Sequence, residues 1–86
     1  MPTISAFFGI AIRMYYDDHG PAHFHAYYGE ASASIVIDTL EVLAGDLPRR
    51  AMTMILEWAV LHRDELRTDW EMAEQHVPLA RIEPLQ

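Results

Sequence analysis

Three histidines and two aspartates are concentrated in the stretch DDHGPAHFHAYY, which covers residues 17–28. Imidazole nitrogens and carboxylate oxygens bind zinc, nickel and copper in proteins. The same groups also transfer protons near neutral pH. The residue types in this stretch therefore leave three interpretations open: a transition-metal site, a metal-free catalytic centre, and a polar surface that contacts a partner protein.

The metal interpretation depends on the spacing of the histidines. His23 and His25 are two positions apart, which places both side chains on one face of a β-strand, and His19 lies across the preceding turn. We expect any bound ion to be zinc, nickel or copper, and no other cofactor is predicted. The candidate ligands are His19, His23, His25, Asp17 and Asp18. Their spacing is looser than that of an H-E-x-x-H helix, so a structural role in a turn and a polar sheet face is the competing interpretation.

The catalytic interpretation adds two residues from the preceding strand. If residues 17–22 close a hairpin, Arg13 and Tyr15 lie on the same face as His23 and His25. Histidine as general acid or base, with arginine stabilising a phosphorane-like charge, is the chemistry that metal-independent RNA cleavage needs. The catalytic residues stay unassigned, and these four are the candidates. The overall charge argues against this interpretation, and we lean towards a protein that is not an enzyme.

The third interpretation is an interaction surface. Arg13, Tyr15, His23, His25 and Tyr27 are expected on one sheet face that the chain itself leaves uncovered. Aromatic residues and arginine dominate the energetics of protein interfaces. We therefore expect a homo-oligomer, or a complex with a small partner protein.

The N-terminal half has the period-two alternation of β-strands, and we expect strands at about residues 7–17, 23–28, 31–38 and 40–43. In the first of these, the even positions from Phe8 to Tyr16 are apolar and are expected to face the core. Residues 17–22 contain Gly20 and Pro21 and are expected to form a turn.

The C-terminal half has a period near 3.6, and we expect helices at about residues 47–62 and 64–76. Asp46 is expected to cap the first helix, with Pro48 in its first turn, and Asp64 is expected to cap the second. Since no glycine or proline separates them, one long kinked helix is the alternative. The sequence predicts a single α+β domain over residues 1–86: a small antiparallel meander of three to four strands followed by two C-terminal helices packed on one face.

The composition restricts the classes of partner. Thirteen acidic residues against six basic ones give a net charge of −7, which disfavours free-standing binding to nucleic acid. Cysteine is absent, so disulfides and thiolate metal sites are excluded. The first sixteen residues carry no basic leader, and the uncharged run that ends at Arg13 is too short to span a bilayer. We expect a cytoplasmic protein that does not enter the membrane.

The string FFGI-x-IRMYYDDH-x-P-x-HFHA-x-Y, together with LPRRAMTMILEWAVLHRDEL, DWEMA and IEPL, resembles the small bacterial domain-of-unknown-function family 4160 (DUF4160). One departure is Ala22, where the family pattern has a second proline. The resemblance implies a compact α+β domain. It also implies that the gene often lies beside one of family 2442, in pairs proposed to be toxin–antitoxin-like modules. No catalytic residue carries over, and the resemblance does not say which member of such a pair this chain is.

Overall fold

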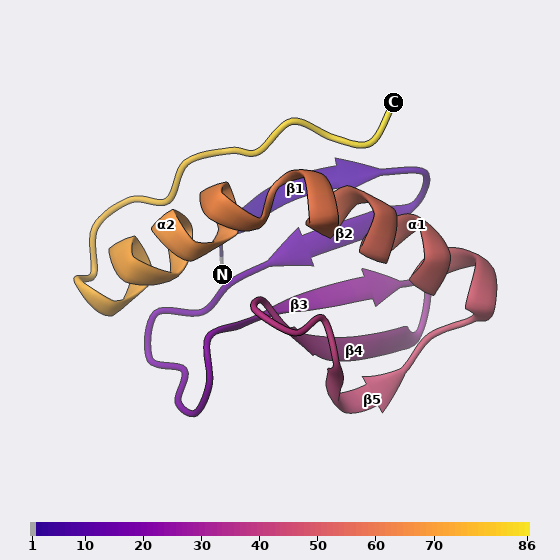
Figure 1. Cartoon of the computed structure of the whole chain (residues 1–86), viewed down its shortest axis with the longest axis horizontal. Helices are drawn as coiled ribbons and strands as arrows, with labels where there is room; N and C mark the ends of the chain where they lie inside the picture. The colour runs from indigo at the N-terminus through magenta and orange to yellow at the C-terminus, as the bar shows by residue number, and fades with distance from the viewer. Residues whose placement is uncertain (1) are drawn as a thin grey trace.

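The computed structural model describes residues 2–86 as one five-stranded antiparallel sheet in the order β1-β2-β3-β4-β5, followed by two helices that lie over one face of the sheet (Figure 1). The expected α+β class and the two C-terminal helices are confirmed, with one strand more than the upper end of the expected range. The elements are β1 (Thr3–Phe7), β2 (Ile10–Arg13), β3 (His23–Tyr28), β4 (Ala31–Val36), β5 (Val42–Asp46), α1 (Arg49–Leu61) and α2 (Arg63–Glu74).

The core lies between the sheet and the helices, and its strand residues follow the period-two pattern. Ile10, Ile12, Phe24, Ala26 and Ile35 are buried on the face that the helices cover. From the helices, the buried residues that meet them are Ala51, Ile55, Trp58, Ala59, Leu66, Trp70 and Ala73. The opposite face of the sheet is therefore available for the polar side chains of the alternate positions.

The single strand expected over residues 7–17 is wrong, because the chain reverses at Phe8 and Gly9. Both residues have positive φ angles, of 48° and 81°, as in the two-residue turns that join antiparallel strands. Phe7 pairs with Ile10 across this turn, which makes β1 and β2 a tight hairpin. Phe8, which was expected to face the core, is 61% exposed. The strand after the turn ends at Arg13, so residues 14–17 belong to a loop.

The helix boundaries also differ from the expected caps. Two helices form rather than one kinked helix, and His62 is the residue between them. Pro48 precedes α1, and Asp46 lies in β5. Asp64 lies in the first turn of α2 instead of capping it, where its negative charge still interacts favourably with the helix dipole.

The last ten residues form no helix or strand, but they pack beside β1. The backbone N–H of Ile82 donates to the carbonyl oxygen of Ile4 at 2.7 Å, and the side chain of Ile82 is buried. The indole N–H of Trp58 donates to the carbonyl oxygen of Glu83 at 2.7 Å, which ties the tail to α1. The tail therefore covers the outer edge of β1. None of the helices among residues 2–86 has the length and apolar character needed to cross a membrane.

Candidate functional site

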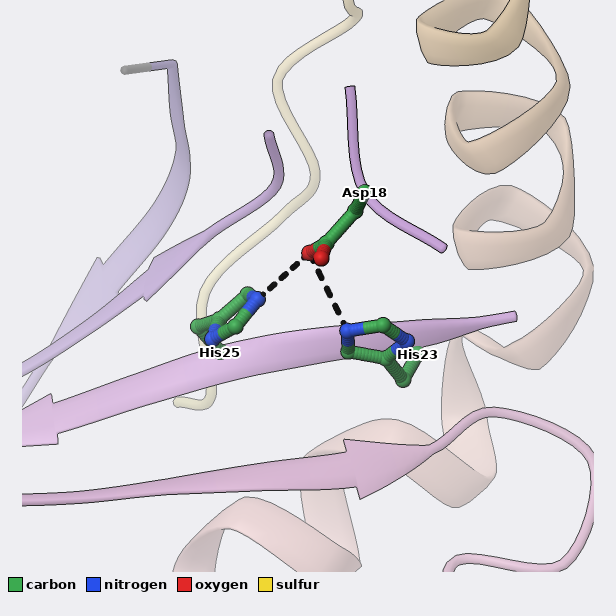
Figure 2. Close-up of side chains that lie close together, drawn as sticks. All are labelled: Asp18, His23 and His25. Atoms are coloured by element: carbon green, nitrogen blue, oxygen red, sulfur yellow. Dashed lines mark hydrogen bonds and ion pairs between the residues drawn. The ribbon is translucent and has the colours of Figure 1, made fainter. Parts of the chain in front are cut away.

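The loop between β2 and β3, residues 14–22, carries the first residue of the site. Its start is held by a hydrogen bond from the N–H of Met14 to the carbonyl of Pro2, and its end by one from the N–H of Ile37 to the carbonyl of Ala22. Gly20 has a φ of 87°, which glycine adopts without a steric penalty. The loop folds back over β3 and directs the carboxylate of Asp18 at two histidines of that strand (Figure 2).

A single oxygen of Asp18 contacts both histidines. Asp18 Oδ2 lies 2.7 Å from Nε2 of His25 and 3.0 Å from Nε2 of His23. The two imidazole rings meet edge to face, with their centroids 5.1 Å apart. The three side chains therefore form one cluster, in which both histidines direct the same ring nitrogen towards the same carboxylate (Figure 2).

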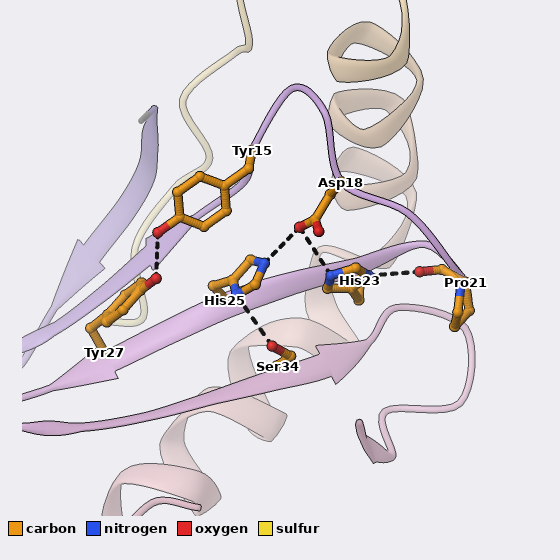
Figure 3. Close-up of polar contacts among 7 residues, drawn as sticks. All are labelled: Tyr15, Asp18, Pro21, His23, His25, Tyr27 and Ser34. Atoms are coloured by element: carbon orange, nitrogen blue, oxygen red, sulfur yellow. Dashed lines mark hydrogen bonds and ion pairs between the residues drawn. The ribbon is translucent and has the colours of Figure 1, made fainter. Parts of the chain in front are cut away.

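Each histidine of this cluster also has a partner on its other ring nitrogen. Nδ1 of His23 lies 2.7 Å from the carbonyl oxygen of Pro21, and Nδ1 of His25 lies 3.2 Å from the hydroxyl of Ser34 (Figure 3). These contacts orient both imidazole rings. Ser34 is positioned for this contact because it is the cross-strand neighbour of His25 in β4.

Tyr15 and Tyr27 flank the cluster, and their hydroxyl groups are hydrogen-bonded to each other (Figure 3). The edge of the Tyr15 ring packs against His25, with the ring centroids 4.6 Å apart. Burial, together with the hydrogen bond to Tyr15, raises the pKa of Tyr27 to about 12. Tyr27 therefore stays protonated at neutral pH and does not act as a base.

The carboxyl group of Asp18 experiences opposing effects. Partial burial raises its pKa, but the hydrogen bond from His25, the charges of His23 and His25, and the backbone N–H of His19 lower it. The net result is a pKa below the ordinary value, so Asp18 is a carboxylate at neutral pH.

Arg13 completes the polar face beside the cluster. It is the cross-strand neighbour of His25, and its guanidinium carbon lies 5.0 Å from the centroid of the Tyr27 ring. Its Nε is buried and has no hydrogen-bond partner among residues 2–86. The expected grouping of Arg13, Tyr15, His25 and Tyr27 is therefore present in the structure. Their half-buried side chains pack on one another and do not form a flat, fully exposed face.

His23 departs from the expected arrangement, because it does not point away from the helices. Only 4% of it is exposed, and its ring lies 5.2 Å from that of Trp70 in α2. His23 is the first residue of β3, at the end of the sheet where α2 packs, so both sides of the strand are covered there.

The structure brings together three of the five candidate ligands. His19 is exposed and is not part of the cluster, and Asp17 lies beside His76, with 3.4 Å between Oδ1 and Nε2. Sequence reasoning missed the contact with the carbonyl of Pro21, because a backbone oxygen carries no signal in the residue types. Trp70 of α2 forms one wall of the cluster, and this contact between helix and sheet also has no signal in the local sequence.

A surface hollow of about 380 Å³ adjoins the cluster at Asp18. Its lining is formed by Pro2, Tyr15, Tyr16, Asp17 and Asp18. The arrangement has the groups required to bind a cation, or to transfer a proton to a small ligand in the hollow.

A family model described as a domain of unknown function, DUF4160, matches residues 9–71, which include β2 to β5, α1, most of α2 and every residue of the cluster. No curated protein matches the chain. No solved structure matches it either.

Proposed function

The chain belongs to the DUF4160 family, whose description assigns no activity, and on the geometry of its sheet we propose that it is a protein-interaction module. The observation that carries this proposal is the difference between the two edges of the sheet. The chain's own tail covers β1, whereas β5 pairs only with β4 among the described residues. The partner in this proposal is the product of a neighbouring gene, the other member of a toxin–antitoxin-like pair, as the family resemblance implies.

The residues of β5 support an edge-to-edge contact. All five are exposed, and its two large apolar side chains, Val42 and Leu43, are 48% and 47% exposed. An exposed edge strand offers unpaired backbone groups, and an extended segment of another protein adds to such an edge as a further strand. This edge supports the proposal better than the sheet face does, since the polar side chains of the face already contact one another.

The charge distribution suggests what kind of segment the edge binds. The chain has a net charge of −7, and exposed carboxylates stand at both ends of the open edge, Glu41 just before β5 and Asp46 as its last residue. Opposite charges steer partners together and fix their register. The partner strand is therefore expected to carry apolar residues flanked by lysine or arginine.

The test is co-expression with the product of the adjacent gene, followed by measurement of the affinity of the purified complex. Val42→Lys places a like charge opposite the basic partner strand and is expected to weaken binding at least about tenfold. Val60→Lys is the matched control, since Val60 is a similarly exposed valine on α1, away from the edge. Equal losses in both variants, or two separate species at micromolar concentration, would contradict the proposal.

A second candidate function is metal-independent cleavage of RNA. It is favoured by one observation: Arg13, Tyr15 and His25 lie together, and Tyr15 also lines a surface hollow. In this candidate, His25 transfers a proton and Arg13 binds the phosphate. Incubation of the purified protein with RNA, beside a His25→Gln variant with unchanged circular dichroism, tests it. Cleavage that the variant retains would rule it out.

A further inference from the structure

The hydrogen bonds of His23 fix the position of one of its protons. Its Nδ1 lies 2.7 Å from the carbonyl oxygen of Pro21, and because a carbonyl oxygen only accepts, Nδ1 carries the hydrogen. In the neutral imidazole, Nε2 then holds a lone pair, and this lone pair faces Oδ2 of Asp18 at 3.0 Å. Two electron-rich atoms at this distance require a cation between them, either a proton or a metal ion.

His25 contacts the same oxygen of Asp18, but its outer partner is a hydroxyl group, which can accept from Nδ1 as well as donate to it. Its Nε2 lies 2.7 Å from Asp18 Oδ2, and its Nδ1 lies 3.2 Å from Ser34 Oγ. Histidines that bind metals commonly donate their second ring N–H to an oxygen acceptor, which fixes the tautomer and the orientation of the ring. Both histidines of the cluster have such an outer partner, and both direct Nε2 towards one point beside Asp18 (Figure 3).

We propose that Asp18, His23 and His25 form a binding site for one divalent transition-metal ion. Their ligand atoms lie within 4.8 Å of one another. Zinc bonds of about 2.0–2.2 Å in a tetrahedral site place ligand atoms about 3.3–3.5 Å apart. To admit the ion, the carboxylate therefore moves outward by about half an ångström, and the two Nε2 atoms, which lie within 4.8 Å of each other, approach to that separation. Asp18 lies on a loop and is 27% exposed, and the ring of His25 is 21% exposed, so both have room to adjust around the buried His23.

The donor set indicates which class of ion binds. Two imidazole nitrogens and one carboxylate oxygen suit zinc, cobalt or nickel, whereas magnesium and calcium prefer oxygen ligands alone. Three protein ligands leave a fourth position for water or for a ligand, as in zinc sites that perform chemistry. The hollow lined in part by Tyr15 and Asp18 adjoins the carboxylate ligand of this site. The site does not include β5, so the inference is independent of the proposed partner contact.

The test uses the full-length protein without a histidine tag, stripped of metal with a chelator and titrated with zinc chloride in a calorimeter. One equivalent of zinc is expected to bind. Cobalt provides a second measurement, because a four-coordinate cobalt ion absorbs visible light far more strongly than the hydrated ion. Since loss of an outer partner costs about 10–100-fold in affinity, Ser34→Ala is expected to weaken binding about tenfold, and Asp18→Asn or His25→Gln at least about 100-fold.

Two further histidines serve as matched controls. His62→Ala removes an imidazole that lies 2.6 Å from the carboxylate of Glu65 and is outside the cluster of Asp18, His23 and His25. His19→Ala removes the sequence-predicted candidate that the structure leaves outside the cluster. Both variants are expected to bind zinc as the parent does. Circular dichroism checks that each variant is folded, and Asp18→Asn is nearly isosteric and partly exposed, so it leaves the core intact. The proposal would be overturned if Asp18→Asn still bound zinc as the parent does, or if the parent bound none. In that case the cation between His23 and Asp18 is a proton.

Discussion

Asp69 is a buried carboxyl group in α2, away from the histidine cluster. Its Oδ1 accepts a hydrogen bond from the N–H of Ala80 at 2.9 Å, and its Oδ2 is buried with no partner among residues 2–86. Burial raises the pKa of Asp69, the hydrogen bond from Ala80 opposes this effect in part, and the negative charge of Glu65 adds to it. A charged Asp69 therefore destabilises the folded state at neutral pH.

The sign of the resulting pH dependence follows from linkage. Because the folded-state pKa is raised above the ordinary 3.8, the folded state binds the proton more tightly. This contribution to stability is fully present below the unfolded pKa and is lost as the pH rises through the folded pKa. Relative to Asp69→Asn, the parent is expected to gain stability as the pH falls from 7 towards 4, by at most about 1.4 kcal/mol per pH unit.

Urea unfolding of both proteins across this pH range measures the difference in free energy of unfolding directly. Taking the difference removes the effect of groups common to both proteins, including Asp18, whose lowered pKa acts in the opposite direction. Glu71→Gln, an exposed carboxyl group on the same helix, is the control and is expected to follow the parent. Parallel curves for the parent and Asp69→Asn would show that burial of Asp69 does not perturb its titration.

At the scale of elements, the β1–β2 turn is the part of the fold whose local sequence suits its conformation least. Phe8 adopts a φ of 48°, although bulky side chains rarely occupy the left-handed region, at a cost of roughly 1–2 kcal/mol. Its ring is largely exposed, so its replacement loses little buried area. Phe8→Asn creates the Asn-Gly pair that two-residue hairpin turns prefer, and it is expected to stabilise the protein by about 0.5–1 kcal/mol.

The measurement is the urea midpoint of Phe8→Asn against the parent. Val60→Asn is the control, because it makes an exposed apolar residue polar within a helix, where no positive φ is relieved. It is expected to be neutral or slightly destabilising, since asparagine is a poor helix former. A gain of equal size in both variants would attribute the effect to surface polarity and not to the turn.

The same turn illustrates what the sequence was able to predict. The helices and the strand of residues 23–28 were placed correctly to within about two residues, because their apolar periodicity comes directly from burial on one face. Phe8-Gly9 carries no recognised turn signal, and the alternation of apolar residues continues through it, so two strands were taken for one.

In the candidate site, the antiparallel pairing of β2 with β3 is enough to place Arg13 beside His25, and the sequence pattern predicted that pairing. The burial of His23 against Trp70 depends on how the helices sit on the sheet, and no local pattern encodes that.

For the whole molecule, the sheet has one covered edge and one open edge, and the tail is responsible for the difference. Ile82 anchors the tail through its buried side chain and its hydrogen bond to Ile4 in β1. Ile82→Ala removes most of the anchor and is expected to cost about 2–4 kcal/mol of unfolding free energy, a large share of the 5–15 kcal/mol typical of a domain. It also exposes a second strand edge, so the variant is expected to self-associate more than the parent as concentration rises.

Sedimentation at two protein concentrations, with urea unfolding at the lower one, separates the two effects of Ile82→Ala. Val77→Ala is the control, because Val77 begins the same tail but is exposed and contributes little packing. If the tail covers the β1 edge, the Ile82 variant is both less stable and more associated, while the Val77 variant matches the parent in both measurements. If the Ile82 variant is less stable but sediments as the parent does, the tail contributes packing and does not protect the β1 edge. The two edges of the sheet would then not differ in the way that the proposed role of β5 requires.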